Sequence, residues 1–227
     1  MKKEKFTAII LARGGSKGIK LKNLKRINGK PLIYWTIRDC MRSKQINSVW
    51  VSTENKKILE YSKKCGAKII NRPKKYAKDT STSDSTWLHA IKFLEKKKNT
   101  SIVNVVGLQP TSPLRDKNDL DKACHLFLKK KYDSLFSALP IFDHFIWKEK
   151  RNKLFANYNF KQRPRRQNIR KKFLENGSFY IFKKNKFILK KNRLFGKIGF
   201  YPMSKINSFQ IDDNDDIKII ESLKKYF

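Results

Sequence analysis

Apolar runs alternate with amphipathic stretches along roughly the first 140 residues of the chain. The run at 7–11 shows no polar alternation, which is typical of a strand buried on both faces of a sheet. In the amphipathic stretches, apolar residues recur every three to four positions, which indicates helices. The pattern predicts strands at 7–11, 48–52, 68–70, 102–108 and 134–139, and helices at 31–41, 55–65, 85–98 and 116–131.

This alternation predicts an α/β fold, in which helices cover both faces of a mostly parallel sheet. The 227 residues suffice for one substantial core, so we expect 1–227 to form a single domain. Ligands of such sheets lie beyond the carboxyl ends of the strands. The loop after 7–11 and the segment that begins at Gln109 both follow strands, so we expect them to face one pocket.

The alternation of predicted strands and helices is interrupted at residues 140–175. Aromatic residues alternate there with cations, and 163–166 contains three arginines. The aromatic positions include Phe142, Phe145, Trp147, Phe155, Tyr158, Phe160 and Phe173. A platform for single-stranded nucleic acid and a protein interface both use this mixture. Strands are expected again at 179–182 and 198–203, and a final helix at 215–226.

The stretch from Leu11 to Gly18 has the composition of a phosphate-binding loop. Leu-Ala-Arg-Gly-Gly-Ser-Lys-Gly holds three glycines, which let the backbone turn tightly and bring N–H groups against a ligand. Its two cations, with Lys20 and Lys22 beyond it, would neutralise a polyphosphate. The glycine spacing matches neither the dinucleotide fingerprint nor the P-loop, so neither of these motifs is supported.

The formal net charge of the chain is +35. Such a field attracts phosphate backbones, so a nucleic-acid-binding protein is one interpretation. The lysines are scattered from end to end rather than gathered in one arm. This distribution favours ordinary solvated faces, with only non-specific attraction for nucleic acid.

Composition also bears on location and on cysteine chemistry. No apolar run approaches the roughly twenty residues of a membrane span, and the first apolar run is too short for a signal peptide. We therefore expect a cytoplasmic protein without membrane contact. The three cysteines lie far apart, which favours buried free thiols over a disulfide or a zinc site.

Four motifs, in order along the chain, resemble those of one enzyme family. They are Ala12-Arg13-Gly14-Gly15-Ser16-Lys17-Gly18 with Leu21-Lys22-Asn23-Leu24, Gln109-Pro110-Thr111-Ser112-Pro113-Leu114-Arg115, Asn176-Gly177-Ser178-Phe179-Tyr180-Ile181, and Ile211-Asp212-Asp213. The set is similar to the signature of the acylneuraminate cytidylyltransferases, the CMP-sialic acid synthetases, and of the related enzymes for legionaminic and pseudaminic acids. One motif would be a weak signal, whereas four in order are specific.

The resemblance implies a Rossmann-like nucleotidyltransferase sheet. It implies a reaction of CTP with an acidic nine-carbon sugar, which gives the CMP-sugar and pyrophosphate for surface-glycan synthesis. It also implies a homodimer in which an excursion, residues 140–175, reaches into the partner's active site; this favours the protein-interface interpretation. Two alternatives stay open. An enzyme that activates the eight-carbon acid Kdo is disfavoured by the glycine loop, and a basic RNA-binding protein on the same scaffold is motivated by the net charge.

The resemblance also assigns residues to the site. The nucleotide would contact Ala12, Arg13, Gly14, Gly15, Ser16, Lys22, Asn23, Arg72, Ser81 and Ser83. The sugar would contact Gln109, Lys148, Arg166, Tyr180 and Phe195. Arg13, Lys22 and Asp212 would be the catalytic group. From the residues alone, the hydroxyls of 71–83 are nearly as well suited to capping, and the core is the better assignment for the aromatic side chains.

A divalent cation, Mg²⁺, is implied at Asp212. The family commonly has an acidic residue two positions before this aspartate, but this chain has Gln210. One carboxylate together with phosphate oxygens suffices for Mg²⁺, so the substitution changes the ligand count rather than excluding the metal. Asp213, Asp215 and Asp216 have an alternative role at the start of the last helix.

Overall fold

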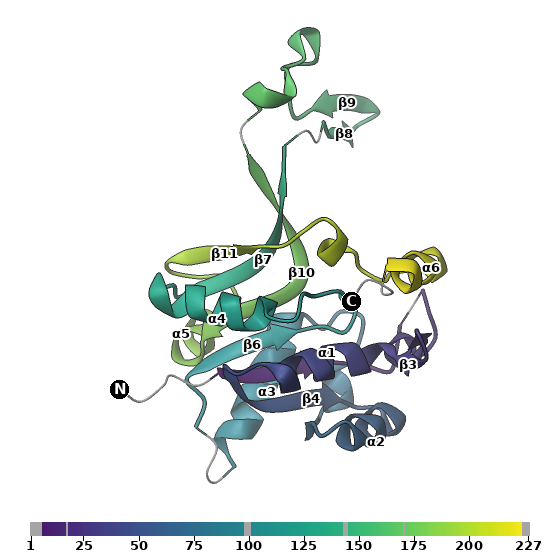
Figure 1. The fold of residues 1–227 in the computed structure, drawn as a ribbon, viewed down its shortest axis with the longest axis vertical. Coiled ribbons are helices and arrows are strands. Elements are labelled where there is room, and N and C mark those ends of the chain that lie inside the picture. Colours follow the sequence, from purple (N-terminus) through teal and green to yellow (C-terminus); the bar gives the residue numbers. More distant parts are fainter. Residues whose placement is uncertain (1–5, 17, 98–100, 143–144, 170, 224–227) are drawn as a thin grey trace.

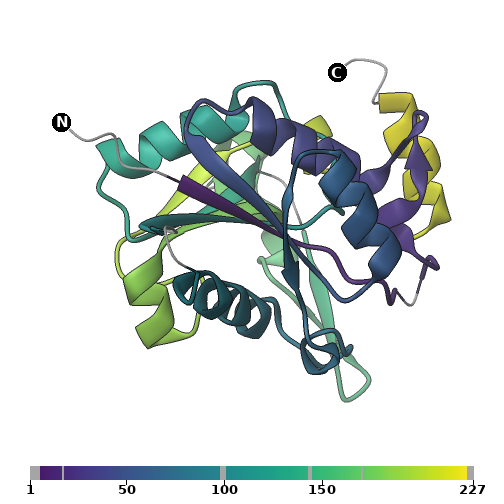
Figure 2. The same cartoon turned by 90° about the horizontal axis from the view of Figure 1, so that it is seen from below.

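The computed structural model describes residues 6–16, 18–97, 101–142, 145–169 and 171–223. Its centre is a seven-stranded sheet with the strand order β11-β7-β10-β6-β1-β4-β5 (Figures 1 and 2). The strands are β1 Phe6–Leu11, β4 Ile46–Thr53, β5 Lys68–Asn71, β6 Asn104–Leu108, β7 Ser134–Ile141, β10 Lys172–Lys183 and β11 Ile198–Pro202. Only β10 is antiparallel to its neighbours β6 and β7, so the predicted mostly parallel sheet is confirmed.

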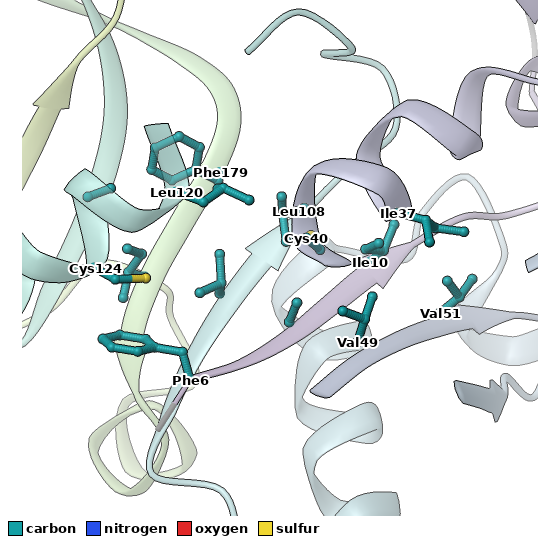
Figure 3. Packing of buried hydrophobic residues seen from close by; sticks show 14 of the residues in the cluster. Phe6, Ile10, Ile37, Cys40, Val49, Val51, Leu108, Leu120, Cys124 and Phe179 are labelled. Atoms are coloured by element: carbon teal, nitrogen blue, oxygen red, sulfur yellow. The ribbon is translucent and has the colours of Figure 1, made fainter. Parts of the chain in front are cut away.

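Helices cover both faces of the sheet, as the alternation predicted (Figure 2). One face carries α1 Leu32–Arg42, α2 Lys56–Lys64 and α4 Asp119–Lys129, and the other carries α3 Ser83–Glu95 and α5 Lys184–Lys190. Phe6 and Ile10 of β1 pack into the first layer (Figure 3). Ile9 packs into the second layer. Because this strand is buried on both sides, its sequence is apolar without alternation.

Smaller elements complete the chain. A third apolar cluster joins Ile19 and Leu114 to Ile211 and Ile217, and so ties the segment after the glycine loop to the C-terminal helix. The remaining short elements are β2 Arg26–Ile27, β3 Lys30–Pro31, α6 Asn214–Leu223, and the 3-10 turns η1 Lys22–Leu24, η2 Lys74–Tyr76, η3 Phe160–Gln162, η4 Arg166–Asn168 and η5 Ile206–Ser208.

Most predicted strands and helices are present within a few residues, but two differ. Helix α5 was not predicted, since Phe187 is its one fully buried apolar side chain and seven residues give little period. The strand predicted at 179–182 is the end of β10, whose earlier half pairs with the last residues of β7. That pairing is non-local, and no pattern within either segment predicts it.

The paired ends of β7 and β10 carry the excursion away from the body of the molecule (Figure 1). At its far end lies a hairpin of β8 Trp147–Lys150 and β9 Lys153–Ala156. Its apolar side chains are unusually exposed, including Leu154 at 66% and Phe155 at 54%. Further exposed apolar residues on the excursion and its stem are Phe142, Ile146, Trp147, Phe160, Phe173 and Leu174.

The three cysteines are free, as predicted. Cys40 and Cys124 are buried, and burial raises the pKa of the Cys40 thiol to about 12, which makes it unreactive at neutral pH. In the described part of the chain, no helix combines the length and apolar character that crossing a bilayer requires.

Candidate active site

The candidate site lies where β1 and β6 end at the same edge of the sheet. The strand order reverses at β1, which pairs with β4 on one side and β6 on the other, and ligands of α/β sheets bind at such a switch point. A cavity of about 380 Å³ opens there and is called the larger cavity. Its lining is Leu11, Arg13, Ser16, Gly18, Lys22, Asn23, Gln109, Pro110, Thr111, Gln210 and Asp212. The prediction that the two post-strand segments face one pocket is confirmed.

A smaller cavity of about 210 Å³ adjoins the larger one and shares Leu11, Arg13 and Gln109 with it. Its other lining residues are Arg72, Tyr76, Lys78, Asp79, Ser81, Ser83 and Thr86. Seven of the ten residues expected at the nucleotide line these two neighbouring cavities, namely Arg13, Ser16, Lys22, Asn23, Arg72, Ser81 and Ser83. Ala12, Gly14 and Gly15 line neither cavity. Thr82 caps helix α3 and Ser81 bonds the Lys75 carbonyl oxygen, so some hydroxyls of this segment do have capping and turn roles.

Three distant segments are joined at the larger cavity by specific hydrogen bonds. Lys22 Nζ donates to the Ile211 carbonyl oxygen at 2.8 Å and to Asp212 Oδ1 at 3.2 Å. The Ile211 N–H donates to the Thr111 carbonyl oxygen at 2.9 Å. A Cβ on Gly18 would lie 2.6 Å from the Asp212 carbonyl oxygen, so only glycine permits this approach.

The glycine loop differs from expectation at Gly14. Its N–H donates to Glu54 Oε1 at 2.6 Å and therefore points into the protein rather than towards a phosphate. Asn23, which is 6% exposed, donates from Nδ2 to the Arg13 carbonyl oxygen at 2.8 Å. Gly14 is required for space, because a Cβ there would lie 2.6 Å from Asn55 Nδ2. Lys17 lies outside the described residues.

Arg13 and Arg72 supply the positive charge where the two cavities meet. Arg13 Nη1 pairs with Asp79 Oδ1 at 2.7 Å. Arg72 is buried, and its Nε and Nη2 donate to the hydroxyl and the carbonyl oxygen of Ser52. Burial lowers the pKa of Arg72 to about 10, against the opposing effect of Glu54, and the group stays cationic at neutral pH.

The amide residues of the larger cavity are oriented by neighbouring motifs. Gln109 Nε2 donates to Ser83 Oγ at 3.1 Å and so links the two cavities. Gln210 Nε2 donates to the carbonyl oxygen of Asn176. The Asn176 side chain in turn is bonded to Ser137 of β7 and to Ser208 of η5. The motif that begins at Asn176 therefore holds the segment preceding Asp212.

The residues fit a metal held mainly by one carboxylate. Asp212 is largely exposed at the cavity and carries the one carboxylate among the described lining residues. Asp213 and Asp216 are occupied as caps, since their carboxylates accept the N–H groups of 215 and 216 and of 212 and 213. Among the described residues, no group of three or more His, Cys, Asp or Glu side chains is placed so that it could hold a metal ion by itself. A cation here would take its remaining ligands from a bound polyphosphate and water.

The residues expected at the sugar are not gathered at these cavities, apart from Gln109. Tyr180 and Phe195 are 5% and 7% exposed and belong to the core on the α3 side. Burial and the bonded carboxylate of Glu175 raise the pKa of the Tyr180 hydroxyl. Lys148 is exposed on β8 of the excursion. Arg166 begins η4, and its side chain lies outside the described part.

Sequence reasoning missed Glu54 and Asp79. Glu54 follows β4 and Asp79 lies in a segment without period, so neither has a local signal. Only their contacts with Gly14 and Arg13 reveal them.

The fold, with a glycine-rich loop at the switch point of the sheet, is that of the nucleotidyltransferases. A solved CMP:2-keto-3-deoxy-manno-octonic acid synthetase complexed with CTP shares it, with a TM-score of 0.70 and 14% identity over 98% of this chain and 99% of that one. At this identity the likeness concerns the fold alone.

The sequence comparisons go further. Residues 7–226 match the family model described as Cytidylyltransferase, and the chain belongs to that family. It is 37% identical over 226 residues to N-acylneuraminate cytidylyltransferase A of Danio rerio, covering 97% of this chain and 51% of the relative. It is 30% identical over 218 residues to CMP-N,N'-diacetyllegionaminic acid synthase of Campylobacter jejuni, covering 94% and 92%. The chain thus spans about half the length of the first of these relatives.

Proposed function

We propose that the chain joins CTP to a nonulosonic acid, N-acetylneuraminic acid or a relative, and releases pyrophosphate. The observation that carries this proposal is the meeting of Arg13, Lys22 and Asp212 around one cavity, in a chain of the cytidylyltransferase family. The relatives named for sialic and legionaminic acid products support the substrate class. Such a product feeds surface-glycan synthesis, and we expect the enzyme to act in the cytoplasm.

The nucleotide would occupy both cavities. Arg13 and Lys22 would neutralise the triphosphate, together with Ser16 and the backbone N–H of Gly15. Arg72, Ser81 and Ser83 line the smaller cavity and would contact the rest of the nucleotide. Gln109 reaches both cavities and would hold the sugar beside the α-phosphorus, because its amide both donates and accepts.

The reaction needs positioning more than covalent chemistry. The anomeric hydroxyl of the sugar attacks the α-phosphorus in line, and the bond to the pyrophosphate oxygen breaks. Fixed cations that face the phosphates stabilise the charge that develops, and a defined geometry removes the entropic cost of alignment. Lys22 is suited to this role because the Ile211 carbonyl oxygen and Asp212 hold its ammonium group at the cavity wall.

Enzymes of this family generally use a divalent cation, and we propose Mg²⁺. When bound, the cation would supply further neutralisation of phosphate charge. Asp212 would hold it. Gln210 would not replace a second carboxylate, because its side chain is neutral and its Nε2 is engaged with the Asn176 carbonyl oxygen.

We further propose a homodimer of single nucleotidyltransferase domains, 1–227, joined through the excursion 140–175. The exposed apolar side chains of the hairpin support this proposal, since a lone chain leaves them in water. Dimerisation would bring Lys148 and Arg166 of the partner to the sugar site.

Pyrophosphate release tests the function directly. Purified protein with Mg²⁺ and CTP should release pyrophosphate with N-acetylneuraminic, legionaminic or pseudaminic acid, and Kdo serves as the control acceptor. Replacing CTP with UTP tests whether the enzyme is specific for the cytosine base. Release with Kdo alone would make this a Kdo-activating enzyme. Salt-dependent RNA binding without release from any acid would replace the proposal with the basic RNA-binding alternative.

A further inference from the structure

The peptide unit between Arg13 and Gly14 is held at both of its poles. Its carbonyl oxygen accepts from Asn23 Nδ2 at 2.8 Å, and its N–H donates to Glu54 Oε1 at 2.6 Å. Two side chains from separate parts of the chain therefore fix one peptide plane. A bond from N–H to a carboxylate is charge-assisted and stronger than a neutral one.

The presence of Glu54 at this point has an electrostatic cost. A carboxylate under the glycine loop repels a polyphosphate, and its second oxygen, Oε2, is buried without a hydrogen bond from any described residue. Such an arrangement is unfavourable unless it is needed for geometry. Part of the cost is offset by Arg72, whose guanidinium interacts favourably with Glu54.

The platform that carries Glu54 is rigid. Thr53 is buried at the end of β4, and its hydroxyl accepts from the Asn55 N–H at 3.1 Å. Asn55 caps helix α2 through the Ile58 N–H at 3.1 Å and lies against Gly14. The carboxylate is thus presented from the junction of a buried strand and a helix, the kind of support that an accurately placed site requires.

We propose that Glu54 is a positioning residue, which clamps the Arg13–Gly14 peptide and thereby aims the Arg13 side chain at the triphosphate. The role rests on the proposed cytidylyltransferase function. Asn23 acts at the opposite pole of the same peptide. The two residues form one device, so removing either releases the same peptide unit.

The amide proton of Gly14 tests the clamp independently of turnover. In Glu54→Ala, the backbone ¹⁵N–¹H signal of Gly14 should move upfield and exchange with solvent about tenfold faster or more. Glu54→Gln retains a side-chain oxygen acceptor and should keep most of the protection. An unchanged Gly14 signal in a folded Glu54→Ala protein would overturn the proposal.

Kinetics test the positioning role. Glu54→Ala should lower kcat/KM for CTP about tenfold to a hundredfold, while Glu54→Gln stays within about threefold of the parent. In Asn23→Ala, the further change Glu54→Ala should cost much less than it does alone, because the peptide is already released. Glu95→Ala, which loses only an exposed pair with Lys184, is the control for acidic-residue loss.

The amide measurement and the kinetics together distinguish failure of the clamp from failure of the proposed function. Additive losses at Asn23 and Glu54, or a lowered Tm with unchanged kcat/KM, would reduce Glu54 to a structural residue and refute the positioning role. If the parent protein turns over no CTP, the proposed function fails, whereas the Gly14 amide still decides whether the clamp exists.

Discussion

The ion pair between Arg13 and Asp79 predicts that one substitution will improve nucleotide binding. Arg13 Nη1 contacts Asp79 Oδ1 at 2.7 Å, so a triphosphate that binds Arg13 must displace this carboxylate. Asp79→Asn removes the competing charge and keeps the size of the side chain. We therefore expect a lower KM for CTP and tighter binding of CTP in calorimetry.

The magnitude follows from the exposure of the pair. The two side chains are 35% and 49% exposed, which places the pair among surface salt bridges worth about 0.2–1 kcal/mol. Relieving that competition corresponds to about 1.4-fold to fivefold tighter binding of CTP. Kcat should change little, because Asp79 is displaced before the chemical step.

A double-mutant cycle gives the decisive comparison. Arg13→Ala alone should cost about 2–4 kcal/mol of transition-state stabilisation, since it removes a charge-assisted phosphate contact. In that background, Asp79→Asn should have almost no effect, because no guanidinium remains to be released. Glu95→Gln, at another partly exposed pair, is the matched control. An equal gain in both backgrounds, or a rise in KM, would refute the reasoning.

Three further predictions concern the metal and the dimer. Asp212→Asn should nearly abolish pyrophosphate release, whereas Asp213→Asn should change both the rate and the Tm little, because asparagine caps a helix about as well as aspartate; equal kinetic losses would give Asp213 a metal role. Gln210→Asp should modestly lower the Mg²⁺ concentration needed for half-maximal rate, because it adds a carboxylate. The gain is limited because the variant loses the bond to the Asn176 carbonyl oxygen. An unchanged Mg²⁺ titration would contradict the predicted gain. Sedimentation should show a dimer. Trp147→Glu should dissociate it, whereas Leu189→Glu, at an exposed position on α5, should not. An active monomer would contradict a site shared between two subunits.

The sheet could be predicted because its signals are local. A strand such as β1, which is buried on both faces, must be largely apolar, and this pattern can be recognised in its own six residues. The position of the site followed as well, since Gln109 and the glycine loop each come directly after a strand. Helix α5 and the stem of the excursion depend on packing between distant segments, so their own residues do not specify them.

The details of the site could be predicted only in part. Arg13, Lys22 and Asp212, the expected catalytic group, line one cavity. The direction of the Gly14 N–H could not be foreseen, because it is set by Glu54, forty positions away. A single glutamate or aspartate in a chain with 54 lysines and arginines has no distinguishing spacing, and its role appears only when the fold supplies its partner.

The hydrogen bonds at Ile211 bear on the order in which the molecule is built. Lys22 and Thr111 are joined to this one residue, which lies after every strand of the central sheet. A chain emerging from the ribosome can therefore pair all seven strands before the wall of its larger cavity exists. Substrate binding then becomes possible only after residues 210–212 have joined the folded sheet, and a chain cut shortly before residue 210 would fold its sheet but lack one wall of the larger cavity.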